Sequence, residues 1–315
     1  MVAASQPKVV AFGGGHGLAA SLSALRRITT ELTAVVTVAD DGGSSGRLRE
    51  EFDCLPPGDL RMALAALCGD DADGRAWASV LQSRFRGTGP LGGHAIGNLL
   101  IAGLWQQYDD PVAGLAMVGK LLNTRGRVLP MSSVPLGIAA DVVGLDPDAP
   151  DEIHTLLGQA AVATTRSVVQ SVRLIPDSPP AHPETLAAVA QADALVLGPG
   201  SWFTSVIPHL LVPKLAEAIL TSKARRILVL NVTAAAETDG FSPSQQLEAL
   251  AEHAPLLRLD TVLAPAGFAA KDPHLSAFAA SLGAELVSHD VAAADGSPRH
   301  DSARFAQALS EVLGS

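Results

Sequence analysis

The sequence predicts an α/β fold with a doubly wound, mostly parallel sheet, and three observations support this prediction. Residues 8–12 form a short apolar strand, a glycine loop follows, and apolar residues then recur at helical spacing from Leu18. A second β-branched run, at residues 35–38, ends just before Asp40. Apolar runs alternate with helical patterns again after residue 182. We therefore expect a Rossmann-like architecture.

The composition agrees with buried parallel strands. Hydrophobic residues make up 48% of the 315 residues and aromatic residues only 4%, so alanine, valine and leucine must fill most of the core. A chain of this length can bury a large core, as one domain or two. Small apolar side chains of this kind suit parallel strands that are covered by helices on both faces.

The charge and the cysteines narrow the class of protein. A net charge of −10 argues against a broad surface for nucleic acid or membrane. We find no signal-peptide pattern in the first seven residues and no apolar stretch long enough to span a bilayer. Cys54 and Cys68 do not form a CxxC pair, so we expect small core residues rather than a disulfide or metal ligands. These features predict a cytoplasmic protein without a nucleic-acid or membrane partner.

A helical block is predicted after the first strand–helix–strand unit. Residues 56–59 (Pro-Pro-Gly-Asp) interrupt the chain, and Asp59 is expected to cap the helix that follows. Further helices are predicted at residues 77–85, 94–105 and 109–122. A block of this length is unusual as a connection in a plain Rossmann fold.

The composition changes at residue 127 and changes back near residue 182. Residues 127–174 are rich in Val, Thr and Ser, with Gly and Pro at turn positions. We therefore predict a small β-rich insertion at residues 127–181 within an α/β domain that comprises residues 1–126 and 182–315. Its second part is predicted to contain strands at 194–197, 227–230 and 261–263, with helices at 184–191, 203–222 and 242–253 and near Leu275 and Phe305.

The segment after residue 38 is the most informative for function. Asp40 and Asp41 precede Gly-Gly-Ser-Ser-Gly, and Arg47 and Arg49 follow. Carboxylates, free backbone N–H groups, hydroxyls and cations are together the groups that hold a phosphorylated ligand, with or without a metal. The alternative is structural: the acids form an Asx turn and a helix cap, and the arginines pair with nearby acids.

The glycine loop at residues 13–17 predicts a site at the same place. Strand, glycine loop, helix, strand and acid form the dinucleotide-binding layout, in which phosphates lie at the helix N-terminus. Asp40 follows the loop at about 20 residues, the spacing of a ribose-binding acid. The loop has Gly13, Gly15 and Gly17 instead of the G-x-G-x-x-G pattern. By itself it is therefore a weak signal for a nucleotide site, but together with the Asp40 segment it is a strong one.

Two later strand ends carry similar groups. Residues 198–205 contain glycine turns followed by hydroxyls, and residues 231–233 lead to Glu-Thr-Asp-Gly at 237–240. In an open parallel sheet, ligands bind beyond the carboxyl ends of the strands. His94 and Asn98 lie four residues apart and share a helix face. We interpret Asn98 as a base or sugar contact and His94 as a cap or core residue.

Taken together, these segments resemble the YvcK/CofD family. The order and spacing agree over nearly the whole chain, and the run from Asp40 to Arg49 is similar to the YvcK branch rather than the phospholactate-transferase branch. The chain departs from the family at His16, where relatives often have threonine, and at residues 231–237, where relatives usually have a Gln-Pro-Gly loop. The matching segments are residues 13–18, 39–49, 57–61, 93–100, 198–201 and 237–240.

The resemblance implies a doubly wound fold and a cytoplasmic protein that binds UDP-N-acetylglucosamine. It also implies a link to cell-wall precursor supply, cell shape and growth on gluconeogenic carbon, with an amino-sugar biosynthetic enzyme as a candidate partner. The CofD relatives instead transfer a phospholactyl group from a guanylylated donor to a deazaflavin, with Mg²⁺.

The leading hypothesis is a regulatory UDP-sugar-binding protein without a catalytic residue or a required cofactor. The competing hypothesis is a Mg²⁺-dependent, CofD-like 2-phospho-L-lactate transferase in which Asp40 and Asp41 hold the metal. An NAD-dependent oxidoreductase is least favoured, because a fingerprint glycine and a catalytic acid or base are missing. A homodimer is the default expectation. The predicted ligand-binding residues are Gly13, Gly14, Gly15, His16, Gly17, Leu18, Asp40, Asp41, Gly42, Gly43, Ser44, Ser45, Arg47, Asn98, Gly200 and Ser201.

Overall fold

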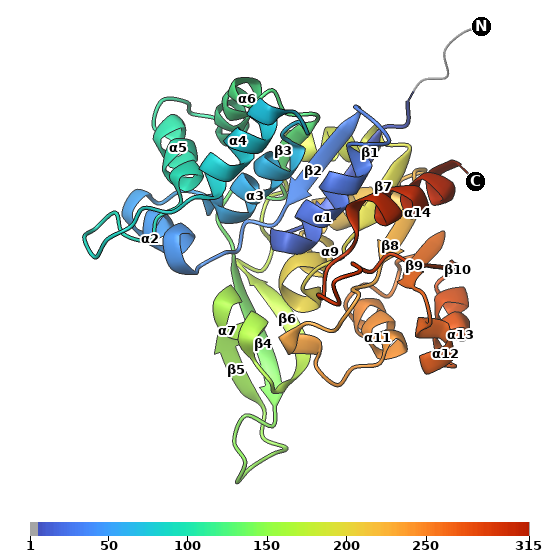
Figure 1. The fold of residues 1–315 in the computed structure, drawn as a ribbon. Coiled ribbons are helices and arrows are strands. Elements are labelled where there is room, and N and C mark those ends of the chain that lie inside the picture. Colours follow the sequence, from blue (N-terminus) through green and yellow to red (C-terminus); the bar gives the residue numbers. More distant parts are fainter. Residues whose placement is uncertain (1–5, 315) are drawn as a thin grey trace, which may run out of the picture.

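The computed structural model describes residues 6–314, and its centre is a seven-stranded sheet (Figure 1). The strand order is β10-β9-β8-β7-β1-β2-β3, and each neighbouring pair is parallel. The predicted α/β fold with a mostly parallel sheet is therefore confirmed. The strands are β1 (Val9–Gly13), β2 (Leu32–Val36), β3 (Arg127–Pro130), β7 (Ala194–Leu197), β8 (Arg225–Val229), β9 (Thr261–Pro265) and β10 (Glu285–His289).

The sheet reverses its winding between β1 and β7. The chain runs from β1 through β2 to one edge, and later from β7 through β8 and β9 to the other edge. Because such crossovers are right-handed, the helices of the two halves cover opposite faces. In open α/β sheets, ligands bind beyond the carboxyl ends of the strands at such a reversal.

Helices cover both faces of this sheet because most of its strands are apolar and buried; every residue of β1, β7 and β9 is buried. In the first half, α1 (Gly15–Leu25) packs against both α3 (Pro57–Leu67) and the C-terminal α14 (Ser302–Gly314). The second half contributes α8 (Pro183–Ala190), α9 (Pro208–Leu211), α10 (Pro213–Thr221), α11 (Pro243–His253), α12 (Phe268–Lys271) and α13 (Leu275–Ser281).

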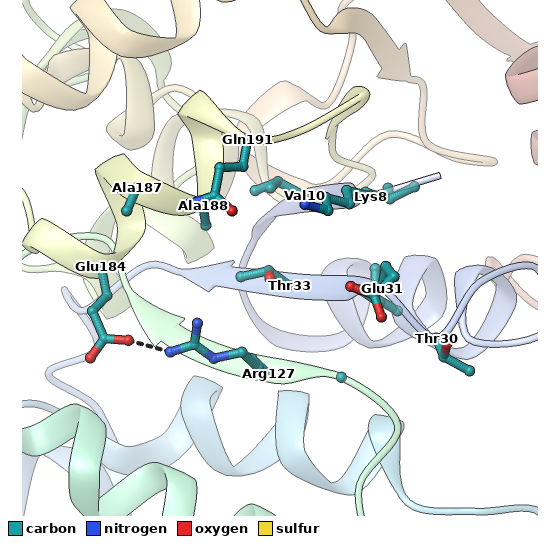
Figure 2. A pocket seen from close by; sticks show the side chains of 13 residues that line it. Lys8, Val10, Thr30, Glu31, Thr33, Arg127, Glu184, Ala187, Ala188 and Gln191 are labelled. Atoms are coloured by element: carbon teal, nitrogen blue, oxygen red, sulfur yellow. Dashed lines mark hydrogen bonds and ion pairs between the residues drawn. The ribbon is translucent and has the colours of Figure 1, made fainter. Parts of the chain in front are cut away.

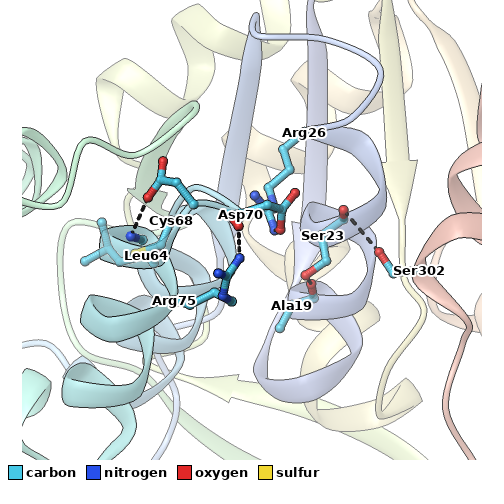
Figure 3. Close-up of polar contacts among 10 residues, drawn as sticks. Ala19, Ser23, Arg26, Leu64, Cys68, Asp70, Arg75 and Ser302 are labelled. Atoms are coloured by element: carbon cyan, nitrogen blue, oxygen red, sulfur yellow. Dashed lines mark hydrogen bonds and ion pairs between the residues drawn. The ribbon is translucent and has the colours of Figure 1, made fainter.

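The predicted helical block lies between β2 and β3. It consists of α2 (Gly43–Phe52), α3, α4 (Ala72–Gln82), α5 (Ile96–Trp105) and α6 (Pro111–Leu121). Figure 3 shows polar contacts between this block and α1, and between α1 and α14. Arg26 at the end of α1 forms a 2.5 Å ion pair with Asp70 beyond α3, and the hydroxyl of Ser302 donates to the carbonyl of Ser23. Cys54 and Cys68 are both free thiols, as expected.

A separate three-stranded antiparallel sheet projects from the body (Figure 1). Its order is β5-β4-β6, with β4 at Gly137–Val143, β5 at His154–Leu157 and β6 at Val168–Ile175. Helix α7 (Gln159–Thr164) joins β5 to β6. The boundary predicted at residue 127 falls on β3, which pairs with β2 in the main sheet, so the antiparallel strands begin ten residues later.

Several element boundaries differ from the sequence prediction. The second strand lies at residues 32–36, and residues 37–39 continue beyond it as buried, non-strand chain toward Asp40. Helix α3 begins at Pro57 with Pro56 as its N-cap, so Asp59 lies in the first helical turn and is not the cap. Proline at the first helical position accounts for this earlier start. Within residues 6–314, we find no helix that is both long and apolar enough to cross a membrane.

Candidate functional site

The glycine loop after β1 packs directly against the loop after β7. A Cβ atom at Gly17 would lie 2.5 Å from the Cα of Gly200 and would overlap the carbonyl of Pro199. A Cβ atom at Gly14 would overlap the Asp59 carboxylate. The glycines are therefore required by close backbone approach, and the structure brings the first and third predicted strand ends together at the winding reversal.

A pocket of about 260 Å³ opens beside this contact. It joins the Asp40 segment to the start of α3 and the start of α5, three regions that are distant in sequence. Its lining residues are Asp40, Gly42, Gly43, Ser44, Ser45, Gly58, Asp59, Arg61, Met62, Arg84 and Asn98. Six of the predicted ligand-binding residues are in this set.

Two carboxylates form the acidic side of the pocket. Asp40 accepts the N–H of Gly42 at 2.9 Å, and its other oxygen lies beside Gly58, where a Cβ atom would be only 2.5 Å away. Asp59 faces Asp40 from α3. Burial, and then the charge of Asp40, raise the pKa of Asp59 to about 7, although the Gly15 N–H and Arg61 oppose this rise. Asp59 is therefore partly protonated at neutral pH, unlike an ordinary aspartate.

Asp40 and Asp41 point to different partners. Asp41 accepts the N–H of Ala160 at 3.0 Å, and its second oxygen lies against Gly158 at the start of α7. It lines a separate, more open pocket of about 590 Å³. The two acids that sequence reasoning paired as metal ligands do not line a common pocket, because the turn directs one toward α3 and the other toward the antiparallel sheet.

A buried polar network forms the opposite side of the pocket. The Ser44 hydroxyl lies 2.9 Å from Nδ1 of His94 and accepts the Asn98 amide at 3.0 Å. The Asn98 carbonyl accepts Nε of Arg61 at 2.8 Å, and Arg61 also donates to Gln82. Burial, and then the charge of Arg47, lower the pKa of His94. Neutral His94 can thus accept the Ser44 proton, which agrees with its interpretation as a core residue.

The arginines that follow the Asp40 segment hold neighbouring loops. Arg47 donates to the carbonyls of Pro90 at 3.2 Å and Gly92 at 2.9 Å, and Arg49 donates to the carbonyl of Leu136 at 2.6 Å. Arg47 lines the open pocket with Asp41 rather than the pocket with Asp40. The cations that line the smaller pocket are Arg61 and Arg84, and neither was among the predicted ligand-binding residues.

The loop after β7 is held by two side chains from the region after β8. Asn231 makes paired hydrogen bonds with the N–H and the carbonyl of Gly200, both at 2.8 Å. Glu237, in the short 3-10 helix η2 (Ala236–Thr238), accepts the N–H of Phe203 at 2.9 Å. Its carboxylate thus occupies the start of the π-helix η1 (Trp202–Val206). The start of η1, next to Gly200 and Ser201, is therefore already occupied by the Glu237 carboxylate.

Replacing Asn231 tests the first of these contacts. Asn231→Leu keeps the branched shape but removes both hydrogen bonds to Gly200, so we expect the free energy of unfolding to fall by about 1–3 kcal/mol in urea titrations. Thr233→Ala, at an exposed position of the same loop, is the matched control and should leave stability unchanged. Equal stability of the two variants would show that Asn231 does not hold the loop.

The N-terminus of α2 remains available for an anion. Its N-cap, Gly42, makes no side-chain cap, and the first residues of the helix, Gly43 to Ser45, line the pocket. Free N–H groups at a helix start bind phosphate well. In the glycine loop, by contrast, Leu18 is buried and its N–H donates to the carbonyl of Gly14, while His16 is exposed on the first turn of α1.

Another cavity, of about 400 Å³, lies at the opposite end of the sheet (Figure 2). It is formed at the start of β1 and β2, and the ion pair between Arg127 and Glu184 crosses one side of it. Lys8 and Glu31 also line it. Because ligands of open parallel sheets bind at the carboxyl ends of the strands, we place the functional site at the pocket with Asp40 and Asp59.

Comparison with known proteins agrees with this architecture. The sequence profile of the CofD family, described as 2-phospho-L-lactate transferase CofD, matches residues 9–301. The chain belongs to the YvcK/CofD family. A Mycobacterium tuberculosis (strain H37Rv) protein with the name "Putative gluconeogenesis factor" is 53% identical over 308 residues, which cover 96% of this chain and 90% of that protein.

More distant family members match over a similar length. The gluconeogenesis factor of Listeria innocua is 35% identical over 321 residues, covering 98% of this chain and 96% of that protein. A crystal structure of a UPF0052 family member from Bacillus halodurans superimposes with a TM-score of 0.84 at 34% identity. It covers 99% of this chain and all of that one. The family resemblance and the fold expected from it are confirmed.

Proposed function

We propose that this family member binds a UDP-sugar, UDP-N-acetylglucosamine, at the carboxyl ends of β1 and β2. The observation that carries the proposal is the uncapped start of α2 inside a pocket that also holds carboxylates and arginines. N–H groups of Gly43 to Ser45 suit a diphosphate. Asp40 would accept ribose hydroxyls, and Arg84 adds a cation at the same pocket.

The side chains favour binding over turnover. Ser44 and His94 are within hydrogen-bond distance, but the Ser44 oxygen accepts both the Asn98 amide and the N–H of Ala95, so both its lone pairs are occupied and it is a poor nucleophile. The relatives with the name gluconeogenesis factor support a role in carbon metabolism. We therefore propose a cytoplasmic regulator of carbon flow into cell-wall precursors, cell shape and growth on gluconeogenic carbon, with an amino-sugar biosynthetic enzyme as partner.

Asp40 and Asp59 favour a second candidate, a Mg²⁺-dependent transferase of the CofD type. Mg²⁺ binds proteins through one or two carboxylates together with substrate phosphates, and this pair faces one pocket. Both carboxylates fit such an ion, and the raised pKa of Asp59 agrees with two like charges close together. When bound, the metal would neutralise phosphate charge, while α2 and the arginines orient the ligand.

Calorimetric titration separates the two candidates. We expect micromolar, Mg²⁺-independent binding of UDP-N-acetylglucosamine, no consumption of the ligand, and weaker binding of GDP and NADH. Preference for the guanine nucleotide with a strict Mg²⁺ requirement would favour the transferase. Binding of none of the three, with a folded protein, would remove the nucleotide-sugar proposal.

The raised pKa of Asp59 predicts that ligand affinity depends on pH, which the same titration measures. Above a pH of about 7 its carboxyl is charged and repels a diphosphate, so affinity should fall by roughly fivefold between about pH 6 and 8. Asp59→Asn should remove this dependence, and Asp41→Asn, whose side chain faces Ala160, should keep it. Complete loss of binding in Asp59→Asn would instead point to a metal that Asp59 holds.

A further inference from the structure

A narrow cavity of about 330 Å³ lies between α6 and β3, at the edge of the main sheet. Figure 1 shows α6 next to β3, and the two elements are in contact. Five of the apolar side chains that line the cavity are buried, each with at most 6% of its surface exposed. The cavity is therefore a slot that reaches into the core and not a shallow surface depression. These five residues are Leu64, Val112, Leu115, Val128 and Leu129.

The sequence of α6 accounts for the slot. The helix residues that line it recur at positions i, i+3, i+4 and i+7, so they share one face of α6; they are Val112, Leu115, Ala116 and Gly119. Val112 and Leu115 are buried and pack over β3. Ala116 and Gly119 have too little side chain to fill the space beside them, and Ala116 is exposed. The open end of the slot therefore lies at the C-terminal half of α6.

The slot carries positive charge and no acid. Lys120 and Arg127 line it, and none of its lining residues is an aspartate or a glutamate. Each of the other three cavities described above has at least two carboxylates. In a chain with 32 acidic residues and a net charge of −10, the slot is thus a local exception. Its charge is complementary to an anion.

Lys120, in the last turn of α6, is free to bind such an anion. Arg127 already forms an ion pair with Glu184. Within residues 6–314, by contrast, the Lys120 ammonium makes no ion pair and no hydrogen bond, and the side-chain amide of Asn123 makes no hydrogen bond. Asn123 also lines the slot. An ammonium and an amide N–H both donate to a carboxylate, so two unused donors lie at the mouth.

An apolar slot with a free cation at its mouth fits an aliphatic carboxylate. A hydrocarbon chain among Leu64, Leu115 and Leu129 would leave water, which is favourable. The carboxylate would stay at the mouth beside Lys120, where it keeps part of its hydration and does not have to be buried unpaired. The volume corresponds to about ten groups of about 30 Å³, which is the space of one water molecule and close to that of a methylene.

We propose that the slot between α6 and β3 binds an aliphatic carboxylate of medium chain length, with its chain among the apolar residues and its carboxylate at Lys120 and Asn123. The slot shares no lining residue with the pocket that contains Asp40 and Asp59. The inference is therefore independent of the ligand proposed for that pocket.

Calorimetric titration of the full chain with decanoate, below the concentration at which it forms micelles, tests the proposal. We expect one equivalent to bind, and the affinity to rise up to about fourfold for each methylene added from hexanoate to decanoate, because each one is buried. Decylamine has the opposite charge and should bind roughly tenfold more weakly. The absence of binding, the binding of several equivalents without dependence on chain length, or equal affinity for decanoate and decylamine would each overturn the proposal.

Two variants test the two ends of the ligand. Ala116→Phe fills the slot and should abolish decanoate binding, whereas Met117→Phe, at an exposed position of α6 outside the slot, is the matched control and should bind as wild type does. Lys120→Glu should lower decanoate affinity roughly tenfold and make decylamine the better ligand. Lys271→Glu, at an exposed position of α12, controls for the change in net charge.

Circular dichroism shows whether each of these variants is folded. If Ala116→Phe does not fold, the reversal of ligand preference in Lys120→Glu decides, because that side chain is exposed. Decanoate binding that is unchanged in folded Ala116→Phe would overturn the proposal. So would a Lys120→Glu variant that still prefers decanoate to decylamine.

Discussion

Gly17→Ala is expected to weaken ligand binding strongly and to destabilise the protein. In most helices, alanine at a glycine position stabilises by about 0.5–1 kcal/mol. Here the added Cβ would lie 2.5 Å from the Cα of Gly200 and would overlap the carbonyl of Pro199. Both are backbone atoms, and Asn231 holds Gly200 in place, so the loops must move apart. We expect a loss of about 1–3 kcal/mol, as in other overpacked sites.

The binding effect should be larger than the stability effect. The loop after β1 and the loop after β7 meet at the winding reversal, and separating them displaces the first turn of α1 beside Asp59. We expect affinity for the proposed nucleotide-sugar to fall by more than about tenfold in calorimetry, since misplaced groups lose most of their binding energy.

Gly103→Ala is the matched control for Gly17→Ala. Gly103 lies inside α5, and a Cβ atom there would meet open space. This variant should bind ligand as wild type does and should gain about 0.5–1 kcal/mol of stability. If Gly17→Ala behaved like Gly103→Ala in both measurements, the close approach of the two loops would have no functional role.

The sheet could be predicted from the sequence because its signals are local. Short apolar runs followed by glycine or acidic residues identify β1 and β7 without any knowledge of their neighbours. By contrast, β10 has the sequence Glu-Leu-Val-Ser-His and is only partly buried, so its pattern resembles that of a loop. The four-residue β3 was assigned to the insertion, since its pairing with β2 depends on the intervening helical block.

The candidate site was predicted in part. The Asp40 segment and Asn98 meet at one pocket, as their positions at a strand end and a helix start suggested. Asp59 was predicted only to cap its helix and support the crevice. That its carboxyl faces Asp40 could not be predicted, because this depends on how α3 packs against α1. The divergence of Asp40 and Asp41 depends on α7, which the sequence did not predict. Such contacts arise from tertiary packing, which no local pattern contains.

Glu237 should carry the second large effect, on stability. It is only 2% exposed, and its carboxyl accepts the N–H of Phe203 and the hydroxyl of Thr204. Glu237→Ala leaves these buried donors without an acceptor at the start of η1, so we expect a loss of about 3 kcal/mol or more. Glu237→Gln keeps the shape; its carbonyl can accept the N–H of Phe203 and its amide can donate to the Thr204 hydroxyl, so it is the matched control.

The pH dependence of stability separates wild type from both variants, because neither alanine nor glutamine titrates. Burial raises the pKa of Glu237 to about 7 in the folded protein, from an ordinary value of 4.5. Between these values the unfolded chain has lost the proton and the folded chain keeps it, so stability falls as pH rises from about 4.5 to 7. Asp59, whose folded pKa is also about 7, acts in the same direction. Glu237→Gln removes only the Glu237 contribution, roughly 3 kcal/mol over this range.

Urea unfolding at about pH 5 and pH 8 measures this difference directly. Glu237→Gln should gain stability relative to wild type as pH rises, because a neutral amide does not have to be ionised in the core. Glu237→Ala should be less stable than wild type at about pH 5, where the wild-type carboxyl is protonated and its contacts are intact. A constant difference between wild type and Glu237→Gln at both pH values would mean that Glu237 is ionised throughout. In that case its N–H and hydroxyl donors, rather than burial, would control its charge.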